Sequence, residues 1–308
     1  MRHSGYNQGD LLRKIKVSFD EPLSKHTSLS IGGPARVFAA PSTLEELKEA
    51  MAEWSGMPVR WLGGGTNVLA GDGPMDALVI STVNMRGIEV LSDNVTGAVL
   101  RVSCGEPLKK LLSFCLERGL SGLEGLVGIP GTFGGAVKGN SGAHGLEMKD
   151  VVFSVCVMDK KGQVQRLNRE EIGFKYRGSA INDPTLIVNA DLALSKGKNS
   201  TEQIKKKMNE FFAMKRHTQP LAQKSAGCVF KNPPGNSAGR LIDQAGLKGA
   251  RIGDIAVSTV HANFFVNLGK GSSSDFLALM ELVSRKVKEQ AGITLSPEIR
   301  ILKNAGNK

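Results

Sequence analysis

The sequence predicts a protein of mixed strands and helices with two or three domains. Alternating apolar and polar runs, typical of strands, are interspersed with amphipathic helical runs. The length of 308 residues exceeds the usual size of one domain. A polar segment without apolar residues, 195–200, separates a longer first part from a shorter last part, and we place the boundary at residue 197.

The first part of the chain is expected to alternate between short strands and two helices. Residues 17–40 predict strand, loop and strand. Thr43 then caps a helix, with Glu46 three residues later as in a capping box. Further along we expect strands over 59–62, 77–82 and 186–194, hairpins over 88–104 and 151–166, and an amphipathic helix over 107–118.

The last part of the chain mixes longer helices with a few strands. The expected elements are a helix from Ser200 to about Arg216, a helix from Ala238, a strand pair between His261 and Leu268, a helix over 274–290 and a final strand over 297–302.

Glycine is concentrated between Gly119 and Gly145, where ten of 27 residues are glycine, against 37 in the whole chain. Large apolar residues such as Leu126 and Phe133 alternate with these glycines, so the stretch is not a flexible linker. Backbone of this composition is buried and tightly turned, or it lies against a flat ligand. A sharply bent core segment and a cofactor site both fit this pattern.

A second glycine run, Gly63–Gly65, follows the strand expected at 59–62. Such a run allows consecutive backbone N–H groups to point at one phosphate. It is not the dinucleotide fingerprint of a Rossmann fold, because 68–73 continues as a loop where that motif needs a helix. Taken by itself, this glycine run is also explained by a tight turn. The two glycine segments together favour a cofactor-binding site.

The net charge of +11 is spread along the chain, with one dense run at Lys205–Lys207. Aromatic residues make up only 5% of the composition, whereas nucleic-acid binders place stacking or base-reading residues beside their basic patches. We therefore expect an anionic small-molecule substrate and no nucleic-acid partner. The alternative of another class is a non-catalytic, basic nucleotide- or nucleic-acid-binding protein.

Cysteine spacing and hydropathy exclude further classes. The four cysteines form no CxxC pair, which argues against a metal site and against a disulfide framework. No apolar run reaches the roughly 18 residues of a spanning helix, and the N-terminus lacks the apolar core of a signal peptide, so we expect a cytoplasmic protein with no membrane partner. Three of the cysteines are expected to be small core residues: Cys104, Cys115 and Cys156.

Nine motifs occur in one order along the chain and carry a resemblance. Together they resemble the UDP-N-acetylenolpyruvoylglucosamine reductase family (UDP-N-acetylmuramate dehydrogenase, MurB) from about residue 24 to 302. The motifs are SIGGPA (30–35), LGGGTNVL (62–69), GLVGIPGTFGGAVKGNSGAHG (125–145), YRGS (176–179), QPL (219–221), SAGCVFKNP (225–233), AGRLIDQAGLKG (238–249), HANFFVN (261–267) and PEIRIL (297–302).

The resemblance implies a fold and a reaction. The fold is an FAD-binding region of the vanillyl-alcohol-oxidase (PCMH) type over 1–197, with subdomains of about 17–85 and 86–197, and a smaller α+β substrate-binding domain over 198–308. In the implied reaction, NADPH reduces non-covalently bound FAD, which then reduces UDP-N-acetylglucosamine enolpyruvate for peptidoglycan synthesis. The chain resembles the shorter subclass of the family, because the segment between Ser179 and Leu186 has no room for a tyrosine-bearing loop. We also expect a monomer.

The resemblance also implies which residues meet the cofactor. Glycine lets backbone amides approach a phosphate or ring edge without a Cβ clash. The residues expected at the pyrophosphate are Gly63, Gly64, Gly65, Thr66 and Asn67. Those expected near the flavin ring are Pro130, Gly131, Thr132, Gly134, Gly135, Ala136 and Asn140.

Three catalytic residues are carried over in the same way. Arg177 would bind the substrate carboxylate and stabilise developing charge, although an arginine of this kind also fits a surface salt bridge. Glu298 would assist while protonated, although such a residue also fits a structural hydrogen bond. Cys228 stands where many relatives have serine as proton donor, and a thiol (pKa about 8.5) is the stronger acid; a small core residue is the other interpretation.

The expected contacts with the UDP-sugar are Arg216, Lys231, Asn232, His261 and Asn263. A histidine such as His261 on a strand also fits a satisfied structural role. The main rival function is an FAD-dependent sugar or alcohol oxidase of the same cofactor fold. Covalent flavin attachment in those enzymes often uses an N-terminal histidine, and no histidine lies between His26 and His144.

Overall fold

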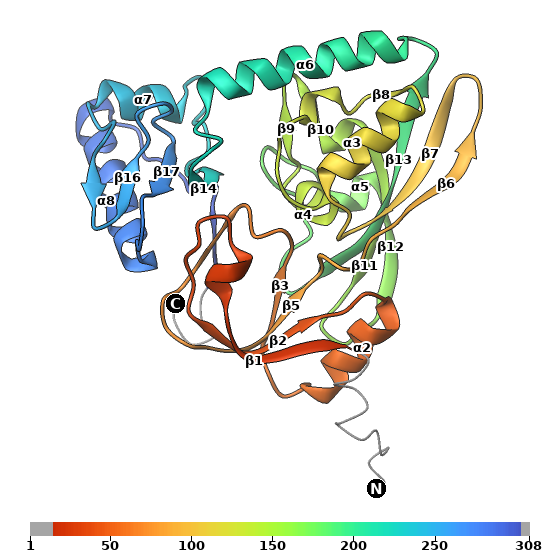
Figure 1. The fold of residues 1–308 in the computed structure, drawn as a ribbon, viewed down its shortest axis with the longest axis horizontal. Helices are drawn as coiled ribbons and strands as arrows, with labels where there is room; N and C mark the ends of the chain where they lie inside the picture. Colours follow the sequence, from red (N-terminus) through yellow and green to blue (C-terminus); the bar gives the residue numbers. More distant parts are fainter. Residues whose placement is uncertain (1–14, 303–308) are drawn as a thin grey trace, which may run out of the picture. The chain divides into compact units, whose positions relative to one another are not determined.

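The computed structural model describes residues 15–302 (Figure 1). These residues form two compact units. Unit 1 contains the described residues up to Phe19 together with Arg36–Gly64 and Asp76–Phe212, and unit 2 contains Asp20–Ala35, Gly65–Met75 and the described residues from Ala213 onward. The division falls inside helix α6 (Thr201–Thr218). The predicted assignment of 1–197 and 198–308 to different ligands stays a prediction, because contacts within the chain do not show which ligand each part binds.

The first sheet of unit 1 has the strand order β1-β2-β5-β3, and β3 runs parallel to β5. Its core combines buried strand residues such as Val37 and Ile80 with Leu47 of helix α2. The elements are β1 (Lys16–Pro22), β2 (Pro34–Ala40), β3 (Val59–Leu62), β5 (Met75–Ser81) and α2 (Leu44–Glu53).

Helix α2 begins after Thr43, as predicted, because the Thr43 hydroxyl accepts a hydrogen bond from the Glu46 N–H at 3.1 Å. The predicted capping box is wrong in its return bond. The Glu46 carboxylate accepts instead from the N–H of Ser42 at 2.6 Å, one residue before the cap.

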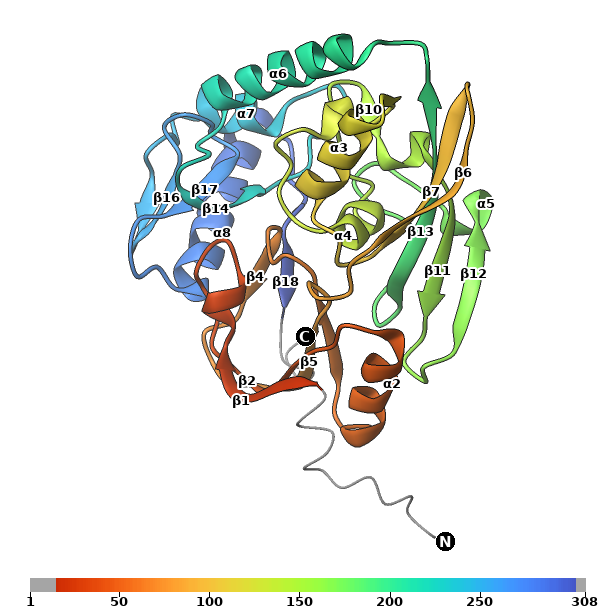
Figure 2. The same cartoon turned by 45° about the vertical axis from the view of Figure 1, so that its right-hand side comes forward.

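The second sheet of unit 1 is antiparallel, with the order β12-β11-β13-β7-β6 and the short β8 paired with β13. Figures 1 and 2 show α3 and α4 against one face of this sheet, where Leu100, Leu111 and Phe133 are buried. Both predicted hairpins, β6-β7 and β11-β12, are confirmed. The elements are β6 (Ile88–Asp93), β7 (Gly97–Ser103), α3 (Leu108–Glu117), β8 (Leu120–Ser121), α4 (Phe133–Lys138), β9 (Gly142–Ala143), β10 (Leu146–Glu147), β11 (Val152–Met158), β12 (Val164–Asn168), α5 (Arg169–Ile172) and β13 (Leu186–Lys196).

Unit 2 is a four-stranded antiparallel sheet, β14-β17-β16-β15, packed against α7 and α8. Phe230, Phe265 and Phe276 lie at the centre of its core. The elements are β14 (Lys224–Cys228), α7 (Ala238–Gln244), β15 (Arg251–Ile252), β16 (Ile255–Val257), β17 (Phe264–Asn267), α8 (Ser273–Ala291), β4 (Val68–Ala70) and β18 (Arg300–Leu302), the last two forming a parallel pair.

Two segments from the first quarter of the chain are built into unit 2. The β4-β18 pair joins one of them to the last strand. The other segment, residues 20–35, is fixed by two hydrogen bonds between side chains and backbone carbonyls. Asn267 Nδ2 donates to the Leu29 carbonyl at 2.9 Å, and Ser28 Oγ donates to the Ser225 carbonyl at 2.7 Å. These bonds explain why unit 2 contains residues from near the start of the chain.

The carboxylate of Asp72 attaches the segment around β4 to the start of α8. Its oxygens accept from the N–H groups of Ser273 at 2.6 Å and Ser274 at 3.1 Å. Burial would raise the pKa of the Asp72 carboxyl, but these hydrogen bonds outweigh it and hold that pKa below its usual value. A negative charge at a helix N-terminus is also favoured by the helix dipole.

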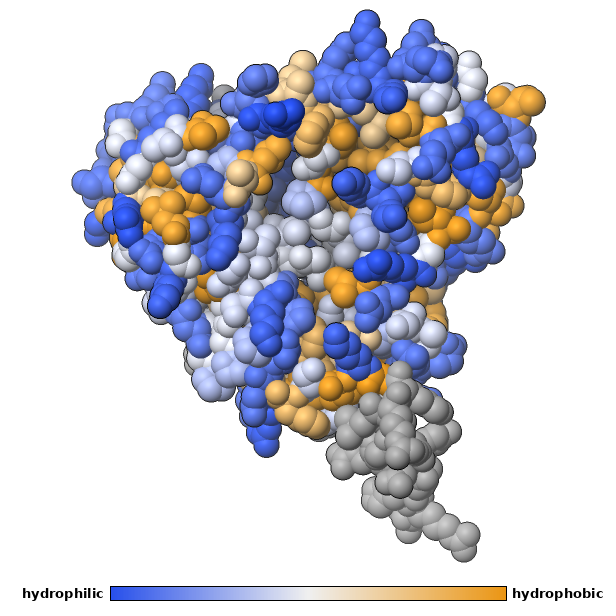
Figure 3. All heavy atoms as spheres, in the orientation of Figure 1, coloured by the Kyte–Doolittle hydropathy of each residue, from blue (hydrophilic) through white to orange (hydrophobic). Residues whose placement is uncertain are grey.

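Polar residues cover much of the face drawn in Figure 3, and apolar residues gather there in small groups. Among residues 15–302, no helix combines the length and the hydrophobicity needed to cross a bilayer.

All four cysteines lie within residues 15–302, and none forms a disulfide. Burial raises the pKa of Cys104 and of Cys115 to about 12, as expected for inert core residues, and Cys156 is half-buried.

We expect Asp72→Ala to lower the free energy of unfolding by about 1–2 kcal/mol, because two helix N–H groups lose their acceptor. This decrease in the free energy of unfolding should have its full size above the usual Asp pKa of about 3.9. It should vanish as the pH falls through the lower pKa that Asp72 has in the folded protein. Urea unfolding at several pH values measures it. The control is Asp76→Ala, which removes an exposed ion pair with Arg36 and should cost under about 0.5 kcal/mol; equal losses would contradict the capping role.

Candidate functional site

Two glycine turns far apart in the sequence lie against each other in unit 1. One follows β3 and contains Gly63 and Gly64; the other precedes α4 and contains Gly131 and Thr132. A Cβ built on Gly64 would lie 2.9 Å from the Gly131 Cα, and one built on Gly63 would lie 2.7 Å from the Thr132 Oγ1. A side chain at 64 would therefore force the two turns apart, and one at 63 would displace the Thr132 hydroxyl.

These turns carry polar groups that the protein itself leaves unpaired. Within residues 15–302, the amide N–H groups of Gly63, Gly64 and Gly131 donate no hydrogen bond to another residue. In the same part of the chain, the Oγ1 of Thr132 is buried and has no partner. Buried polar groups are nearly always paired, so the Thr132 hydroxyl calls for a partner from outside the protein. The amides beside it belong to half-buried glycines, and together these groups fit a ligand that offers acceptors, such as phosphate oxygens or the edge of a flavin ring.

The start of α4 is used partly for packing. The N–H groups of Phe133 and Gly134 donate to the carbonyls of Glu106 and Cys104, each at 2.8 Å. A Cβ on Gly134 would lie 2.6 Å from that of Cys104, so glycine is needed for the helix to approach the end of β7. Gly134 therefore serves the fold through its amide, and the flavin contacts expected of Pro130, Gly135 and Ala136 stay predictions.

Asn140 at the end of α4 is fully buried, and its side chain is occupied by the protein. Its Nδ2 donates to Glu147 Oε2 at 3.0 Å and to the Lys175 carbonyl at 3.1 Å, and its Oδ1 accepts from the Lys149 N–H at 3.0 Å. Its φ of 44° lies in the left-handed region that asparagine tolerates better than most residues. The side chain thus anchors the segment that leads to Arg177, and its expected flavin contact stays a prediction.

Arg177 lies in a tight turn in which Lys175 and Gly178 exchange backbone hydrogen bonds of 3.0 and 3.1 Å. Its backbone φ is 52°, and its guanidinium donates to the Gly142 carbonyl at 3.0 Å. The charge of Arg177 also helps to lower the pKa of Glu147, after the larger effect of a hydrogen bond from Lys149. The cation is therefore held by backbone and by an anionic neighbour within unit 1.

Unit 2 brings the segments of Cys228 and Glu298 together. The Glu298 N–H donates to the carbonyl of Val229, directly after Cys228 in the chain, at 2.8 Å. Asn67 adds a third segment, since its Nδ2 donates to the Glu298 carbonyl at 3.3 Å. Both candidate catalytic side chains are half-buried. Arg177 belongs to unit 1, so the three predicted catalytic residues come from both units.

The predicted substrate residues differ in how far the protein already uses them. Asn232 Oδ1 accepts from the Ala238 N–H, the first of α7, at 3.0 Å, whereas Arg216 is exposed on α6. Burial lowers the pKa of His261, whose Nδ1 accepts from the Asn263 N–H at 3.1 Å. A neutral ring in this position fits a structural role as well as a substrate contact.

Sequence reasoning did not single out Lys215, which is buried on α6 and whose pKa burial lowers to about 8. The helical spacing does contain the signal. Ile204, Met208 and Phe211 precede it at intervals of three or four residues and are all buried or half-buried, so Lys215 continues their face.

Within the described range, no three His, Cys, Asp or Glu side chains are grouped to hold a metal ion.

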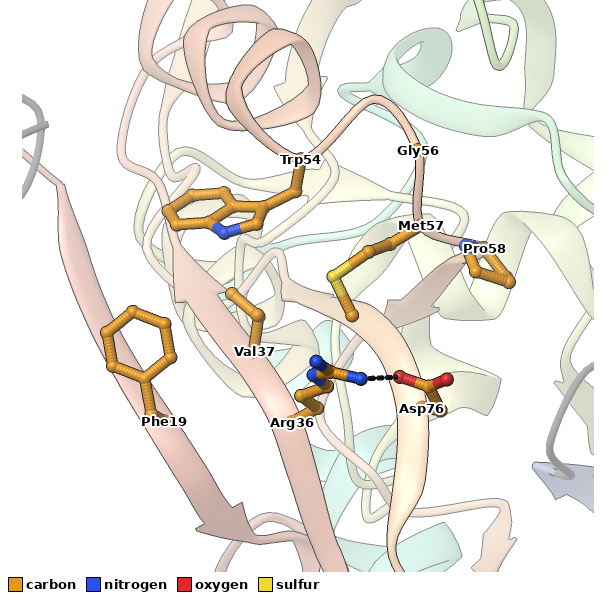
Figure 4. A pocket seen from close by; sticks show the side chains of 8 residues that line it. All are labelled: Phe19, Arg36, Val37, Trp54, Gly56, Met57, Pro58 and Asp76. Atoms are coloured by element: carbon orange, nitrogen blue, oxygen red, sulfur yellow. Dashed lines mark hydrogen bonds and ion pairs between the residues drawn. The ribbon is translucent and has the colours of Figure 1, made fainter.

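A separate hollow of about 440 Å³ in unit 1 contains none of the predicted site residues. Figure 4 shows Trp54, Met57 and Phe19 around it, with the Arg36–Asp76 ion pair of 2.8 Å at one side. Its apolar lining and single exposed ion pair offer no constellation for catalysis.

Two family models match this chain. Residues 35–168, which include both glycine turns, match the FAD binding domain family, and residues 219–302 match the C-terminal domain of UDP-N-acetylenolpyruvoylglucosamine reductase. A chitooligosaccharide oxidase structure shares the fold at a TM-score of 0.57 and 11% identity, covering 97% of this chain and 90% of its own. Fold and site define an FAD-dependent oxidoreductase with an α+β cofactor region of the PCMH type.

The relatives identify the family. The chain is 42% identical over 302 residues to the UDP-N-acetylenolpyruvoylglucosamine reductase of Rubrobacter xylanophilus, covering 96% of this chain and 99% of that one. It is 40% identical to the enzyme of that name from Lactococcus lactis subsp. cremoris, covering 94% and 95%. The Thermus caldophilus reductase structure matches with a TM-score of 0.77 at 36% identity over 94% of this chain and 99% of its own. This chain belongs to the UDP-N-acetylenolpyruvoylglucosamine reductase family.

We expect Gly64→Ala to lower FAD affinity at least about tenfold, because the added methyl overpacks the contact with Gly131. The ratio of flavin to protein absorbance after purification, followed by FAD titration, measures this. Gly56→Ala is the matched control, since no atom lies within 4 Å of its built Cβ. Full flavin occupancy in Gly64→Ala, with unchanged affinity, would show that the turns do not hold the cofactor.

Proposed function

We propose that this chain reduces UDP-N-acetylglucosamine enolpyruvate to UDP-N-acetylmuramate, a step of peptidoglycan synthesis, with NADPH as reductant and non-covalently bound FAD. The observation that carries the proposal is the pair of abutting glycine turns with unpaired donors, in a chain that matches this reductase family over almost its whole length. When bound, FAD supplies a two-electron carrier that takes a hydride from NADPH and gives it to the enolpyruvyl group.

Gly63, Gly64 and Gly131 would donate their backbone N–H groups to the cofactor, and Thr132 would contribute its hydroxyl. Thr66 and the remaining residues of the two glycine segments would complete the contacts. The donors belong to closely packed turns, and donors that are already in place before binding reduce the ordering cost of binding the ligand.

Arg177 is proposed to bind the substrate carboxylate. A guanidinium pairs with a carboxylate through two parallel hydrogen bonds, and it stabilises the negative charge that develops beside the carboxylate during hydride addition. The hydrogen bond to the Gly142 carbonyl fixes the side chain, and the Glu147 carboxylate adds a favourable charge nearby.

Cys228 is proposed to deliver the proton that completes the reaction, to the carbon next to the carboxylate. A thiol, with an ordinary pKa of about 8.5, is a much stronger acid than a serine hydroxyl and can fill the same role. Glu298 would assist while protonated, by donating a hydrogen bond to the developing charge. The hydrogen bond from the Glu298 N–H to the Val229 carbonyl supports this pairing, because it holds both segments side by side.

The UDP-sugar would be bound by Arg216, Lys231, Asn232 and His261, and the net charge of +11 favours such an anionic ligand.

We also propose that the chain belongs to the shorter subclass of the family. Only six residues separate Ser179 from β13, too few for a tyrosine-bearing loop. We expect the protein to act as a monomer.

We expect Arg177→Ala and Glu298→Gln to bind FAD and to be reduced by NADPH, but to lose reduction of the enolpyruvyl sugar by about 100-fold or more, because each stabilises charge only in that step. Anaerobic stopped-flow absorbance of the flavin separates the two half-reactions. Loss of flavin reduction by NADPH in either variant would refute this assignment. Flavin that is reoxidised by oxygen with no response to the enolpyruvyl sugar would favour an oxidase instead.

We expect Cys228→Ser to keep substantial activity and Cys228→Ala to lose it, because only the first retains a proton on the side chain. Steady-state turnover of the enolpyruvyl sugar with NADPH measures both. The buried thiol of Cys115 provides a control, since Cys115→Ala should affect stability more than turnover. Equal turnover by the Cys228→Ser and Cys228→Ala variants would exclude the thiol as the proton donor.

A further inference from the structure

The backbone next to Cys228 is irregular and needs support beyond the sheet. Along β14 and β17 the register shifts between Ser225↔Val266 and Cys228↔Phe264, which leaves one extra residue on β14. Gly227, with a φ of 75°, makes this bulge possible. A bulge turns the following side chain away from the regular ladder, so the direction of Cys228 depends on how the next residues are fixed.

The next two residues are fixed by Asn263. Its backbone carbonyl accepts from the Val229 N–H at 2.8 Å. Its side chain forms the pair of hydrogen bonds that the backbone of a neighbouring strand would form. Its Oδ1 accepts from the Phe230 N–H at 3.0 Å, and its Nδ2 donates to the Phe230 carbonyl at 2.8 Å. Asn263 is only 2% exposed, so both polar atoms of its side chain are committed to one residue of this segment.

The same segment also supports Glu298. The Val229 carbonyl accepts from the Glu298 N–H at 2.8 Å, and the Lys231 N–H donates to the Ser296 carbonyl at 2.8 Å. Residues 229–231 therefore lie between Asn263 on one side and the segment of Glu298 on the other. A shift of residues 229–231 would move Cys228 and Glu298 together.

We propose that Asn263 is a positioning residue for the proton-transfer step, acting through the backbone of Val229 and Phe230 on Cys228 and Glu298. The inference rests on the proposed roles of those two residues. It replaces the direct substrate contact predicted from the HANFFVN motif, because the buried amide faces the Phe230 backbone. His261 supports the arrangement by accepting the Asn263 N–H.

The test compares Asn263→Leu, Cys228→Ala and the double variant, each as the FAD-bound full chain. Leucine has a similar size but leaves the N–H and carbonyl of Phe230 without partners. The readout is the rate of reoxidation of NADPH-reduced flavin by UDP-N-acetylglucosamine enolpyruvate, in anaerobic stopped flow. Asn263→Asp, which keeps the shape and the acceptor, repeats the comparison if the leucine variant does not fold.

Asn267→Leu is the matched control. Asn267 lies at the end of β17 and is 5% exposed. Its side chain also makes three hydrogen bonds to backbone, at Leu29, Gly269 and Gly271, none of them to the Cys228 segment. The substitution should lower the melting temperature comparably to Asn263→Leu while changing reoxidation by less than about threefold, since residues without shared partners behave independently.

We expect Asn263→Leu to slow reoxidation at least about tenfold with flavin reduction by NADPH unchanged. In the Cys228→Ala background it should slow reoxidation by a smaller factor, because the proton donor is already absent there and only the displacement of Glu298 remains. Equal slowing in both backgrounds, or none in either, would overturn the positioning role while leaving Cys228 as the proton donor. Normal reoxidation in Cys228→Ala alone would overturn the proposed role of Cys228 and this inference with it.

Discussion

The close approach of two glycine turns is the constraint on which the proposed chemistry depends. Gly63 and Gly64 lie against Gly131 and Thr132 with no space for a Cβ between them. This contact brings together backbone donors that make no hydrogen bond to another residue within 15–302. A pyrophosphate or a flavin edge would complete hydrogen bonds that the protein leaves open. The turn before α4 is also tied to the end of β7, because that helix approaches Cys104 through Gly134.

The chemistry would then need separate groups for charge and for protons. The structure holds each group by backbone interactions: Arg177 in a four-residue turn anchored by Asn140, and Cys228 beside Glu298 through Val229. Buried asparagines recur in this support because one amide offers both a donor and an acceptor to irregular backbone. Such support fixes a reacting side chain without competing for the substrate.

Local signals in the sequence predicted much of the fold. The cap at Thr43, both hairpins and α8 follow from patterns within about 20 residues. The ordered glycine motifs predict a cofactor site at the two turns, and that site stays a prediction. Patterns of this kind do not show which distant backbone groups pair. The inclusion of residues 20–35 and 65–75 in unit 2, and the bonds of Asn263 to Phe230, depend on such pairing. Lys215 was missed because a lysine on an apolar helix face was not expected to be buried.

A crystal structure of the FAD-bound protein tests the central claim most directly. The amide nitrogens of Gly63, Gly64 and Gly131 should lie within about 3 Å of oxygen or nitrogen acceptors of the cofactor, the normal hydrogen-bond range. Flavin bound elsewhere in the molecule, with these amides facing only water, would contradict it.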